Sequence, residues 1–264
     1  MNAFTTTPVL EYCFTARYGK REVLHQVAGV IQAGEIVSLV GLSGSGKSTL
    51  ALSLMGLLGY RGGIVTGSVR LEGRELTGLS GAEMRKLRGK RIGYVPQSPA
   101  AALNAKLRVR TLLEETWKAH ATTNASAEDF AALLESVQLP GTPDFLQRRS
   151  GELSTGQGQR LLIALAIMHK PALLLADEPT SALDAITQAA ILRLFGELNQ
   201  RLGTAILFIS HDLLSVATLS RRVDILHEGR VVESGPPARI FREPAHPFTR
   251  ELVAALPRNA FPEA

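Results

Sequence analysis

A glycine-rich stretch at residues 41–49 carries residue types that bind phosphate. It contains the spacing Gly41-x-x-x-x-Gly46-Lys47-Ser48, which is typical of a P-loop. Backbone N–H groups approach phosphate oxygens closely there, which glycine permits and a Cβ obstructs. Lys47 supplies positive charge to the β- and γ-phosphates, and the Ser48 hydroxyl ligates Mg²⁺. The sequence therefore predicts that ATP and Mg²⁺ bind at Gly41, Ser43, Gly44, Ser45, Gly46, Lys47, Ser48 and Thr49.

Two adjacent carboxylates end an apolar run, Leu173-Leu174-Leu175-Ala176-Asp177-Glu178. Asp177 is expected to hold Mg²⁺ through water. Glu178 can face the γ-phosphate, where it would orient or deprotonate the attacking water. Taken alone, such a pair is often a helix-capping feature, but together with a P-loop it indicates phosphoryl chemistry.

The elements that position these residues alternate between strand and helix. Residues 35–41 are apolar and β-branched, which favours a buried strand, and residues 47–58 have helical spacing that ends at Gly59. Further strands are expected at 64–72, 91–96, 173–176, 205–210 and 222–227, and further helices at 187–202 and 213–220. This order predicts an α/β fold with a mixed, mostly parallel sheet and flanking helices, and ligands bind such sheets at the carboxyl ends of the strands.

One segment departs from this alternation. Residues 98–150 are rich in Ala and Leu and mostly helical in pattern, which indicates a helical lobe inserted into a P-loop NTPase core. We expect a single domain over 1–264, with a nucleotide-binding core at 1–97 and 159–235. A helical subdomain is expected at 98–158, and a C-terminal appendage at 236–264.

Composition narrows the class of protein. The chain has 264 residues, 45% of them apolar, and a net charge of +5 with a pI near 9.6. The basic residues are scattered and aromatic residues are only 5%, which argues against a dedicated nucleic-acid groove. The single cysteine, Cys13, excludes a disulfide framework and suits the cytoplasm. No signal peptide or membrane-spanning segment is predicted, so membrane association is expected through a partner.

Several further segments resemble the ATP-binding-cassette (ABC) ATPase family over nearly the whole chain. Leu153-Ser154-Thr155-Gly156-Gln157 resembles the family's signature loop, normally Leu-Ser-Gly-Gly-Gln. Gln97 matches the Q-loop glutamine, and Ser181-Ala182-Leu183-Asp184 matches the D-loop. His211 matches the switch histidine, and Tyr18 lies where the family places an aromatic residue that stacks on adenine.

The resemblance implies a role for each matched residue. Gln97 would ligate Mg²⁺ or the water and couple nucleotide state to a partner, and His211 would hydrogen-bond the γ-phosphate. The implied catalytic residues are Lys47, Gln97, Glu178 and His211, and the implied metal ligands are Ser48, Gln97 and Asp177. Each of the three residues also has a purely structural interpretation when taken singly. Tyr18 could be a half-exposed strand aromatic, Gln97 a surface amide, and His211 a helix-capping histidine.

The resemblance also implies a head-to-tail dimer in which each ATP lies between two subunits. Ser154, Gly156, Gln157 and Asp184 would then contribute to nucleotide binding, the signature residues contacting the partner's ATP. Thr155 departs from the family's glycine. A β-branched residue resists positive φ, so Thr155 is tolerated if it is helical, whereas a left-handed position would weaken turnover.

The amino-acid sequences of three segments resemble those of the dipeptide, oligopeptide and nickel importer branch of this family. These are Pro96-Gln97-Ser98-Pro99, the stretch from Ala176 to Asp184, and His246-Pro247-Phe248-Thr249-Arg250-x-Leu252. The last could also be a proline-punctuated terminal helix. The absence of a cysteine cluster after it favours nickel or metal-chelate members modestly.

The leading hypothesis is therefore the ATPase subunit of an importer for peptides, nickel or metal chelates. It would lie on the cytoplasmic face of a bacterial inner membrane with a second ATPase subunit, identical or different, and two permease subunits. A periplasmic or extracellular binding protein would deliver the solute, and no nucleic acid is expected. The alternatives are an ABC component of a phosphonate-degrading lyase complex, an ABC protein acting on DNA or ribosomes, and a nucleotide-binding partner with little turnover.

Overall fold

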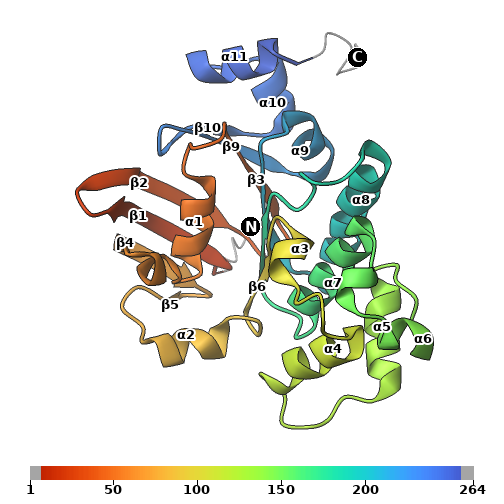
Figure 1. Ribbon diagram of the computed structural model, residues 1–264. Coiled ribbons are helices and arrows are strands. Elements are labelled where there is room, and N and C mark those ends of the chain that lie inside the picture. The colour runs from red at the N-terminus through yellow and green to blue at the C-terminus, as the bar shows by residue number, and fades with distance from the viewer. Residues whose placement is uncertain (1–6, 257–264) are drawn as a thin grey trace, which may run out of the picture. The chain divides into compact units, whose positions relative to one another are not determined.

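The computed structural model describes residues 7–256 and consists of two compact units, shown in Figure 1. The first unit comprises the chain up to Leu79 and from Ala205 onward, and the second comprises Ser80–Thr204. The first and last residues of the sequence, 1–6 and 257–264, lie outside the described part. The end of the predicted appendage at 236–264 therefore lies outside the described residues.

An antiparallel sheet opens the first unit, with the strand order β2-β1-β4-β5. Its strands are β1 (Leu10–Tyr18), β2 (Arg21–Ile31), β4 (Gly63–Leu71) and β5 (Arg74–Glu75). Buried and exposed side chains alternate along β1, as expected for a strand that covers the core with one face. β4 was expected from the sequence at 64–72, whereas β1, β2 and β5 were not expected.

The phosphate-loop candidate belongs to the other sheet of this unit, where the order is β10-β9-β3-β8. Its strands are β3 (Ile36–Val40), β8 (Ala205–Ser210), β9 (Arg222–His227) and β10 (Arg230–Gly235). β3 pairs in parallel with both β8 and β9, and β9 pairs antiparallel with β10. Every residue of β3 and β8 is buried, which is typical of parallel strands covered on both faces.

Short helices complete the first unit. They are α1 (Lys47–Leu54), the 3₁₀ turn η1 (Leu58–Arg61), α9 (Leu213–Leu219), α10 (Pro237–Arg242) and α11 (Pro247–Ala254). The predicted helix 47–58 was too long, because the chain reverses at Gly56, which has a φ of 61°. The short helices expected after Gly235 are present as α10 and α11, which follow β10 in Figure 1.

The second unit combines two parallel strands with helices. β6 (Ile92–Val95) pairs in parallel with β7 (Leu173–Asp177). The helices are α2 (Gly81–Leu87), α3 (Pro99–Ala102), α4 (Val109–Lys118), α5 (Ala127–Ser136), α6 (Pro143–Gln147), the 3₁₀ turn η2 (Ser150–Glu152), α7 (Thr155–Ile167) and α8 (Ala185–Leu202). The predicted mixed, mostly parallel α/β fold is confirmed, while the predicted subdomain boundaries stay a prediction.

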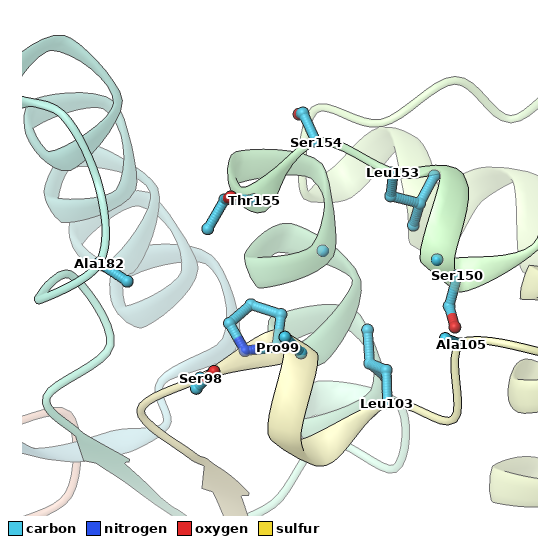
Figure 2. Close-up of a pocket in the computed structure, with 12 residues that line it drawn as sticks. Ser98, Pro99, Leu103, Ala105, Ser150, Leu153, Ser154, Thr155 and Ala182 are labelled. Carbon is cyan, nitrogen blue, oxygen red and sulfur yellow. The ribbon is translucent and has the colours of Figure 1, made fainter.

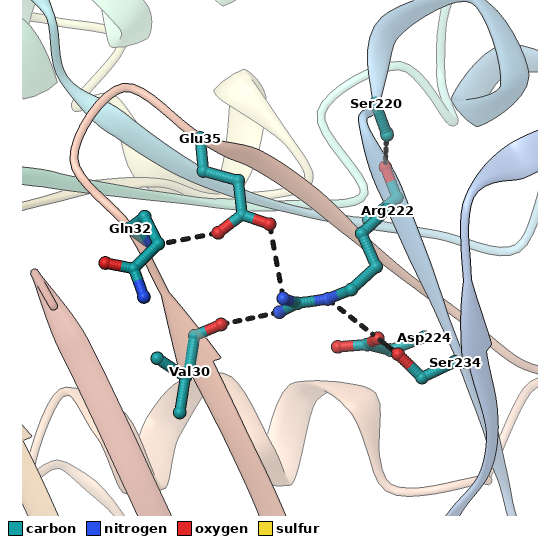
Figure 3. A network of polar contacts seen from close by, with 8 residues as sticks. Val30, Gln32, Glu35, Ser220, Arg222, Asp224 and Ser234 are labelled. Carbon is teal, nitrogen blue, oxygen red and sulfur yellow. Dashed lines mark hydrogen bonds and ion pairs between the residues drawn. The ribbon is translucent and has the colours of Figure 1, made fainter. Parts of the chain in front are cut away.

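A polar network fixes the end of the first unit's central sheet that lies away from residues 41–49 (Figure 3). Arg222 begins β9 and donates to the Val30 carbonyl at 2.6 Å, to Glu35 at 3.2 Å and to Asp224 at 3.2 Å. Ser234 on β10 donates to the same Asp224 carboxylate. Burial raises the pKa of Asp224 although Ser234 and Arg222 favour its ionised form. The network therefore ties β2, β3, β9 and β10 together at this end.

Membrane association was expected to come through a partner. Within residues 7–256, no helix has the length and apolar character needed to cross a bilayer.

Candidate functional site

The phosphate loop, residues 41–49, connects the buried strand β3 to helix α1. Gly46 caps α1 with a φ of 110°, and no side chain caps this helix. Gly44 also has a positive φ, of 82°. L-residues rarely adopt these conformations, so the two glycines give the loop a shape that turns backbone N–H groups and the positive end of the α1 dipole toward one side.

At position 41, glycine is needed because another backbone segment passes close by, and not because of a positive φ. A Cβ at Gly41 would lie 2.3 Å from the Leu226 carbonyl oxygen and 2.7 Å from Ser45 Oγ. The Ser45 hydroxyl is itself buried and has no hydrogen-bond partner among the described residues. A buried hydroxyl without a partner is costly, and a phosphate oxygen bound in the loop would be a suitable acceptor.

Lys47 places its charge inside the same loop. The side chain is nearly inaccessible, with 5% relative exposure, and Nζ donates to the Gly41 carbonyl at 2.8 Å and the Leu42 carbonyl at 3.1 Å. A buried ammonium is stable only when it is well paired. The loop therefore fits a polyanion such as a triphosphate, whose oxygens can pair with Nζ more strongly than carbonyls do.

Tyr18 and His211 lie in the same unit as the phosphate loop. Tyr18 is the last residue of β1 and is half-buried, and a Cβ at Gly63 would lie 3.1 Å from its ring. His211 directly follows β8 and is exposed. Asp212 beside it caps α9 by accepting from the Leu214 N–H, so the helix start expected next to this histidine is confirmed.

The two carboxylates lie in the second unit, at the carboxyl end of β7. Asp177 is buried with 7% exposure and accepts a long hydrogen bond, 3.3 Å, from the Tyr94 hydroxyl. Glu178 has a φ of 47°, a left-handed conformation that is unfavourable for a residue with a side chain and that often occurs at functional sites. No helix begins at this pair, because α8 starts only at Ala185.

Gln97 follows β6 and is hydrogen-bonded to the segment after β7 that begins with Glu178. Its amide Nε2 donates to Glu178 Oε2 at 3.3 Å and to Ser181 Oγ at 3.1 Å. Ser181 Oγ in turn donates to the Glu178 carbonyl at 3.1 Å. The structure thus brings the Q-loop and D-loop candidates together with Glu178. Tyr94 was not expected at the site from the sequence, and Ser181 was expected there only as part of the D-loop.

The signature-loop candidate is the start of helix α7. Ser154 Oγ accepts from the Gln157 N–H at 3.2 Å, and Gln157 Oε1 accepts from the Ser154 N–H at 3.1 Å, which forms a capping box. Thr155 is the first helical residue and is absent from the non-glycine residues with positive φ in the described chain. It therefore has the backbone that tolerates a β-branched side chain. At Gly156 a Cβ would lie 2.9 Å from Thr187 Cγ2.

Asp184, the D-loop aspartate, caps helix α8. Its carboxylate accepts from the N–H groups of Ile186 and Thr187 and from the Thr187 hydroxyl. These hydrogen bonds, led by those from Thr187, lower the pKa of Asp184. Asp184, Ser154 and Gln157 therefore each have a structural role in addition to any contact with nucleotide.

A cavity of about 310 Å³ is lined by residues of both the segment after Gln97 and the signature loop. Figure 2 shows Pro99 and Leu103 on one side and Thr155 at the start of α7 on the other. Its wall is mostly small or apolar and includes Ala100, Ala105, Gly151, Leu153, Gly158 and Ala182. A partner segment seated there would contact the Q-loop segment and the signature loop at once.

The predicted metal ligands come from both units, Ser48 from the first and Gln97 and Asp177 from the second. In the described range 7–256, no group of three or more His, Cys, Asp or Glu side chains could hold a metal alone. Mg²⁺ is commonly held by one or two carboxylates together with substrate phosphates, and Ser48, Gln97 and Asp177 each carry an oxygen of the type that binds this ion. Their assembly around one nucleotide stays a prediction.

Comparison with known proteins gives the family. The ABC transporter family matches residues 24–181. A putative peptide import ATP-binding protein of Brucella ovis is 39% identical over 259 residues, covering 94% of this chain and 76% of the relative. The oligopeptide transport ATP-binding protein OppD of Escherichia coli K12 is 37% identical over 251 residues, covering 94% of this chain and 74% of that protein.

A solved structure supports the same assignment. It is a dimeric ATP-binding cassette in a post-hydrolysis state, bound to ADP and Pi, with a TM-score of 0.73 and 28% identity. The match covers 86% of this chain and 98% of that cassette. By these matches and its phosphate loop, the chain belongs to the ABC transporter family and is an ATP-hydrolysing cassette of that family.

Proposed function

We propose that this chain is the ATP-hydrolysing subunit of a peptide importer, working as a dimer on the cytoplasmic face of the membrane with two permease subunits. The relatives named for peptide import and oligopeptide transport support the solute class. The observation that carries the catalytic assignment is Glu178, held in a left-handed backbone directly after Asp177 and hydrogen-bonded to Gln97.

The proposed reaction is attack of water on the γ-phosphate of ATP. The phosphate loop and Lys47 bind the phosphates, and Tyr18 offers its ring to the adenine. Mg²⁺, held by Ser48, Asp177 and Gln97, would neutralise charge on the β- and γ-phosphate oxygens. Glu178 orients the water and accepts its proton, and His211 donates a hydrogen bond to the γ-phosphate.

The dimer supplies the remaining contacts. Ser154, Gly156 and Gln157 of one subunit face the nucleotide of the other, at the N-terminus of α7, whose dipole favours an anion. The solved dimeric cassette bound to ADP and Pi supports this arrangement. Whether the second subunit is a copy of this chain or a different cassette is settled by which proteins copurify with it.

Exchange of one carboxylate tests the catalytic role. We expect Glu178→Gln to lower kcat for ATP hydrolysis by at least about a hundredfold, the usual size of a general-base contribution, while MgATP still binds. Glu135→Gln is the matched control, because Glu135 is an exposed glutamate on α5 of the same unit. Unchanged turnover in Glu178→Gln would remove Glu178 from the mechanism.

Transport assays test the solute class. Vesicles containing the chain with its genetically neighbouring permease and binding protein should take up labelled short peptides in an ATP-dependent manner. Uptake of nickel or a metal chelate in place of peptides would reassign the solute. Copurification with lyase subunits instead of permeases would favour the phosphonate alternative.

A further inference from the structure

The turn between β9 and β10, residues 227–230, lies directly against the phosphate loop. The Gly229 N–H donates to the carbonyl of Ser45 at 3.1 Å. The carbonyl of Leu226, just before the turn, leaves no room for a Cβ on Gly41. The end of β9 and the β9–β10 turn therefore contact the loop at two points, at Gly41 and at Ser45.

This turn has little freedom to move. Gly229 has a φ of 72°, and a Cβ there would lie 2.1 Å from the Val23 carbonyl oxygen. Its own carbonyl accepts from the His25 N–H at 2.8 Å. Because β2 holds the turn on one side and the phosphate loop contacts it on the other, a displacement of the turn is transmitted to Ser45.

Helix α11, near the C-terminal end of the described chain, contacts the same turn through a pair of aromatic rings. The His227 ring stacks on the Phe248 ring with a centroid distance of 3.8 Å and an interplanar angle of 22°. Phe248 is buried with 7% exposure, and its N–H donates to His246 Nδ1 at 3.2 Å, which caps α11. The stack thus joins α11 to the first residue of the turn.

A buried carboxylate fixes the position of this segment. Glu233 on β10 accepts from the N–H groups of Ala245 and His246 at 2.9 and 3.0 Å and is only 7% exposed. Burial opposes its ionisation, but these two hydrogen bonds and the charge of Arg239 help to keep the pKa of Glu233 below its usual range. The chain just before α11 is therefore anchored to the strand that leaves the turn.

We propose that this C-terminal clasp, formed by Glu233, Ala245, His246 and Phe248, positions the phosphate loop for ATP. Phe248 is a positioning residue that acts through His227 and the β9–β10 turn on Ser45, without touching the nucleotide. The inference builds on the proposed ATP binding at residues 41–49. It gives the His-Pro-Phe-Thr segment a role in nucleotide affinity in addition to closing the fold.

Removal of the Phe248 ring tests this proposal. We expect Phe248→Ala to raise the KM for MgATP about three- to tenfold, within the range of an aromatic pair, and to change kcat less than about twofold. Phe248→Tyr keeps the ring and should restore the wild-type KM. Phe145→Ala is the matched control, since Phe145 is an equally buried ring, 3% exposed, in the unit without the phosphate loop.

A double-mutant cycle and amide exchange separate positioning from simple destabilisation. His227→Ala and Phe248→Ala should raise KM by less together than the product of their separate effects, because they remove one pair. Amide hydrogen exchange at residues 41–49 and at Gly229 should accelerate in Phe248→Ala and not in Phe145→Ala.

Two results would overturn the proposal. One is an unchanged KM and unchanged exchange in Phe248→Ala, and the other is an equal KM rise in Phe145→Ala. If the wild-type chain hydrolysed no MgATP, the proposed function would fail, and amide exchange alone would still decide whether the clasp holds the phosphate loop.

Discussion

The phosphate loop and the signature loop both lead into a helix, and they satisfy the start of that helix in opposite ways. α7 is capped within the chain by the side chains of Ser154 and Gln157. α1 begins at Gly46, with no side-chain cap and no acidic residue in its first turn. The start of α1 can therefore bind an external anion without displacing a side-chain cap, whereas at the start of α7 the Gln157 N–H is already bonded to Ser154.

This difference separates two kinds of polar residue. The shape of the phosphate loop depends on backbone that favours glycine at Gly44 and Gly46, and the buried Ser45 hydroxyl has no hydrogen-bond partner among the described residues. Ser154, Gln157 and Asp184 would be useful to the fold even if no nucleotide approached them. Experiments on the second group therefore need controls that subtract the loss of a cap.

Among changes at the two helix starts, the largest effect is expected from Gly46→Ala. A Cβ there would be placed at a φ of 110° and 2.6 Å from Leu24 Cδ2, so the backbone at the start of α1 is strained and either Leu24 or this backbone must shift. We expect the KM for MgATP to rise about tenfold or more, the cost of one to two kcal/mol of backbone strain transferred to the phosphate contacts, as measured by steady-state hydrolysis.

Gly78→Ala is the control for that change. Gly78 also has a positive φ, of 86°, but no atom lies within 4 Å of a Cβ built there. It should lose similar stability from the backbone alone and keep a wild-type KM. An equal rise in KM for both variants would mean that the phosphate loop tolerates a shift at Gly46.

Ser154→Ala should have the next largest effect. It removes the cap of α7 and costs about 1 kcal/mol of stability, the usual value for an N-cap serine. Ser80→Ala removes an equivalent capping box from α2 in the same unit and should cost about as much. If Ser154 also contacts the nucleotide of a partner, only Ser154→Ala should lower kcat, by about three- to tenfold for one hydrogen bond. Equal kcat values would leave Ser154 a helix cap alone.

The sequence predicted the parts of the fold that depend on continuous apolar runs. β8 and β9 have the predicted limits, and β3, β6 and β7 lie within a residue or two of theirs. β1 and β2 were missed because an alternating strand with one exposed face, such as Leu10–Tyr18, has no continuous apolar run. The end of α1 was missed because the reversal at Gly56, φ 61°, precedes the more obvious stop at Gly59.

The sequence predicted which residues form the candidate site, but it did not predict their backbone conformations or hydrogen bonds. Motif spacing located Gly41, Lys47, Asp177 and Glu178 at the carboxyl ends of strands, where the structure has them. Spacing has no information on the left-handed backbone of Glu178 or on its hydrogen bond from Gln97, because these depend on residues 81 positions apart. The contact of Gly229 with Ser45 is hidden for the same reason.

Thr155→Gly should have a small effect. Thr155 already has a helical backbone as the first residue of α7, so glycine relieves no strain and costs about 0.5 kcal/mol or less through lower helix propensity. Turnover should stay within about twofold of wild type, the rate change that such an energy produces. A sharp rise in turnover would show that threonine restrains this loop. That result would favour the alternative in which this chain binds nucleotide as a partner subunit and itself hydrolyses little ATP.

The first unit also contains a built-in anion that can be compared with the phosphate loop. Glu75 on β5 accepts from the N–H groups of Val69 and Thr77 at 2.9 and 3.0 Å, and from the Ser68 hydroxyl. Desolvation opposes its ionisation, but the hydrogen bonds together hold the pKa of Glu75 at about 2, against an ordinary value of 4.5.

The smallest effect is therefore expected from Glu75→Gln, and it depends on pH. A folded-state pKa below the unfolded value means that the carboxylate stabilises the fold above about pH 4.5 and that this contribution is lost as the pH falls toward 2. Because the side chain is 40% exposed, we expect a loss of only about 1 kcal/mol or less at pH 7. Urea unfolding should show a smaller gap in stability between the variant and wild type at pH 3 than at pH 7. A gap as large at pH 3 as at pH 7 would show that the amide is excluded by packing, and that charge on the acceptor is not what these backbone N–H groups require.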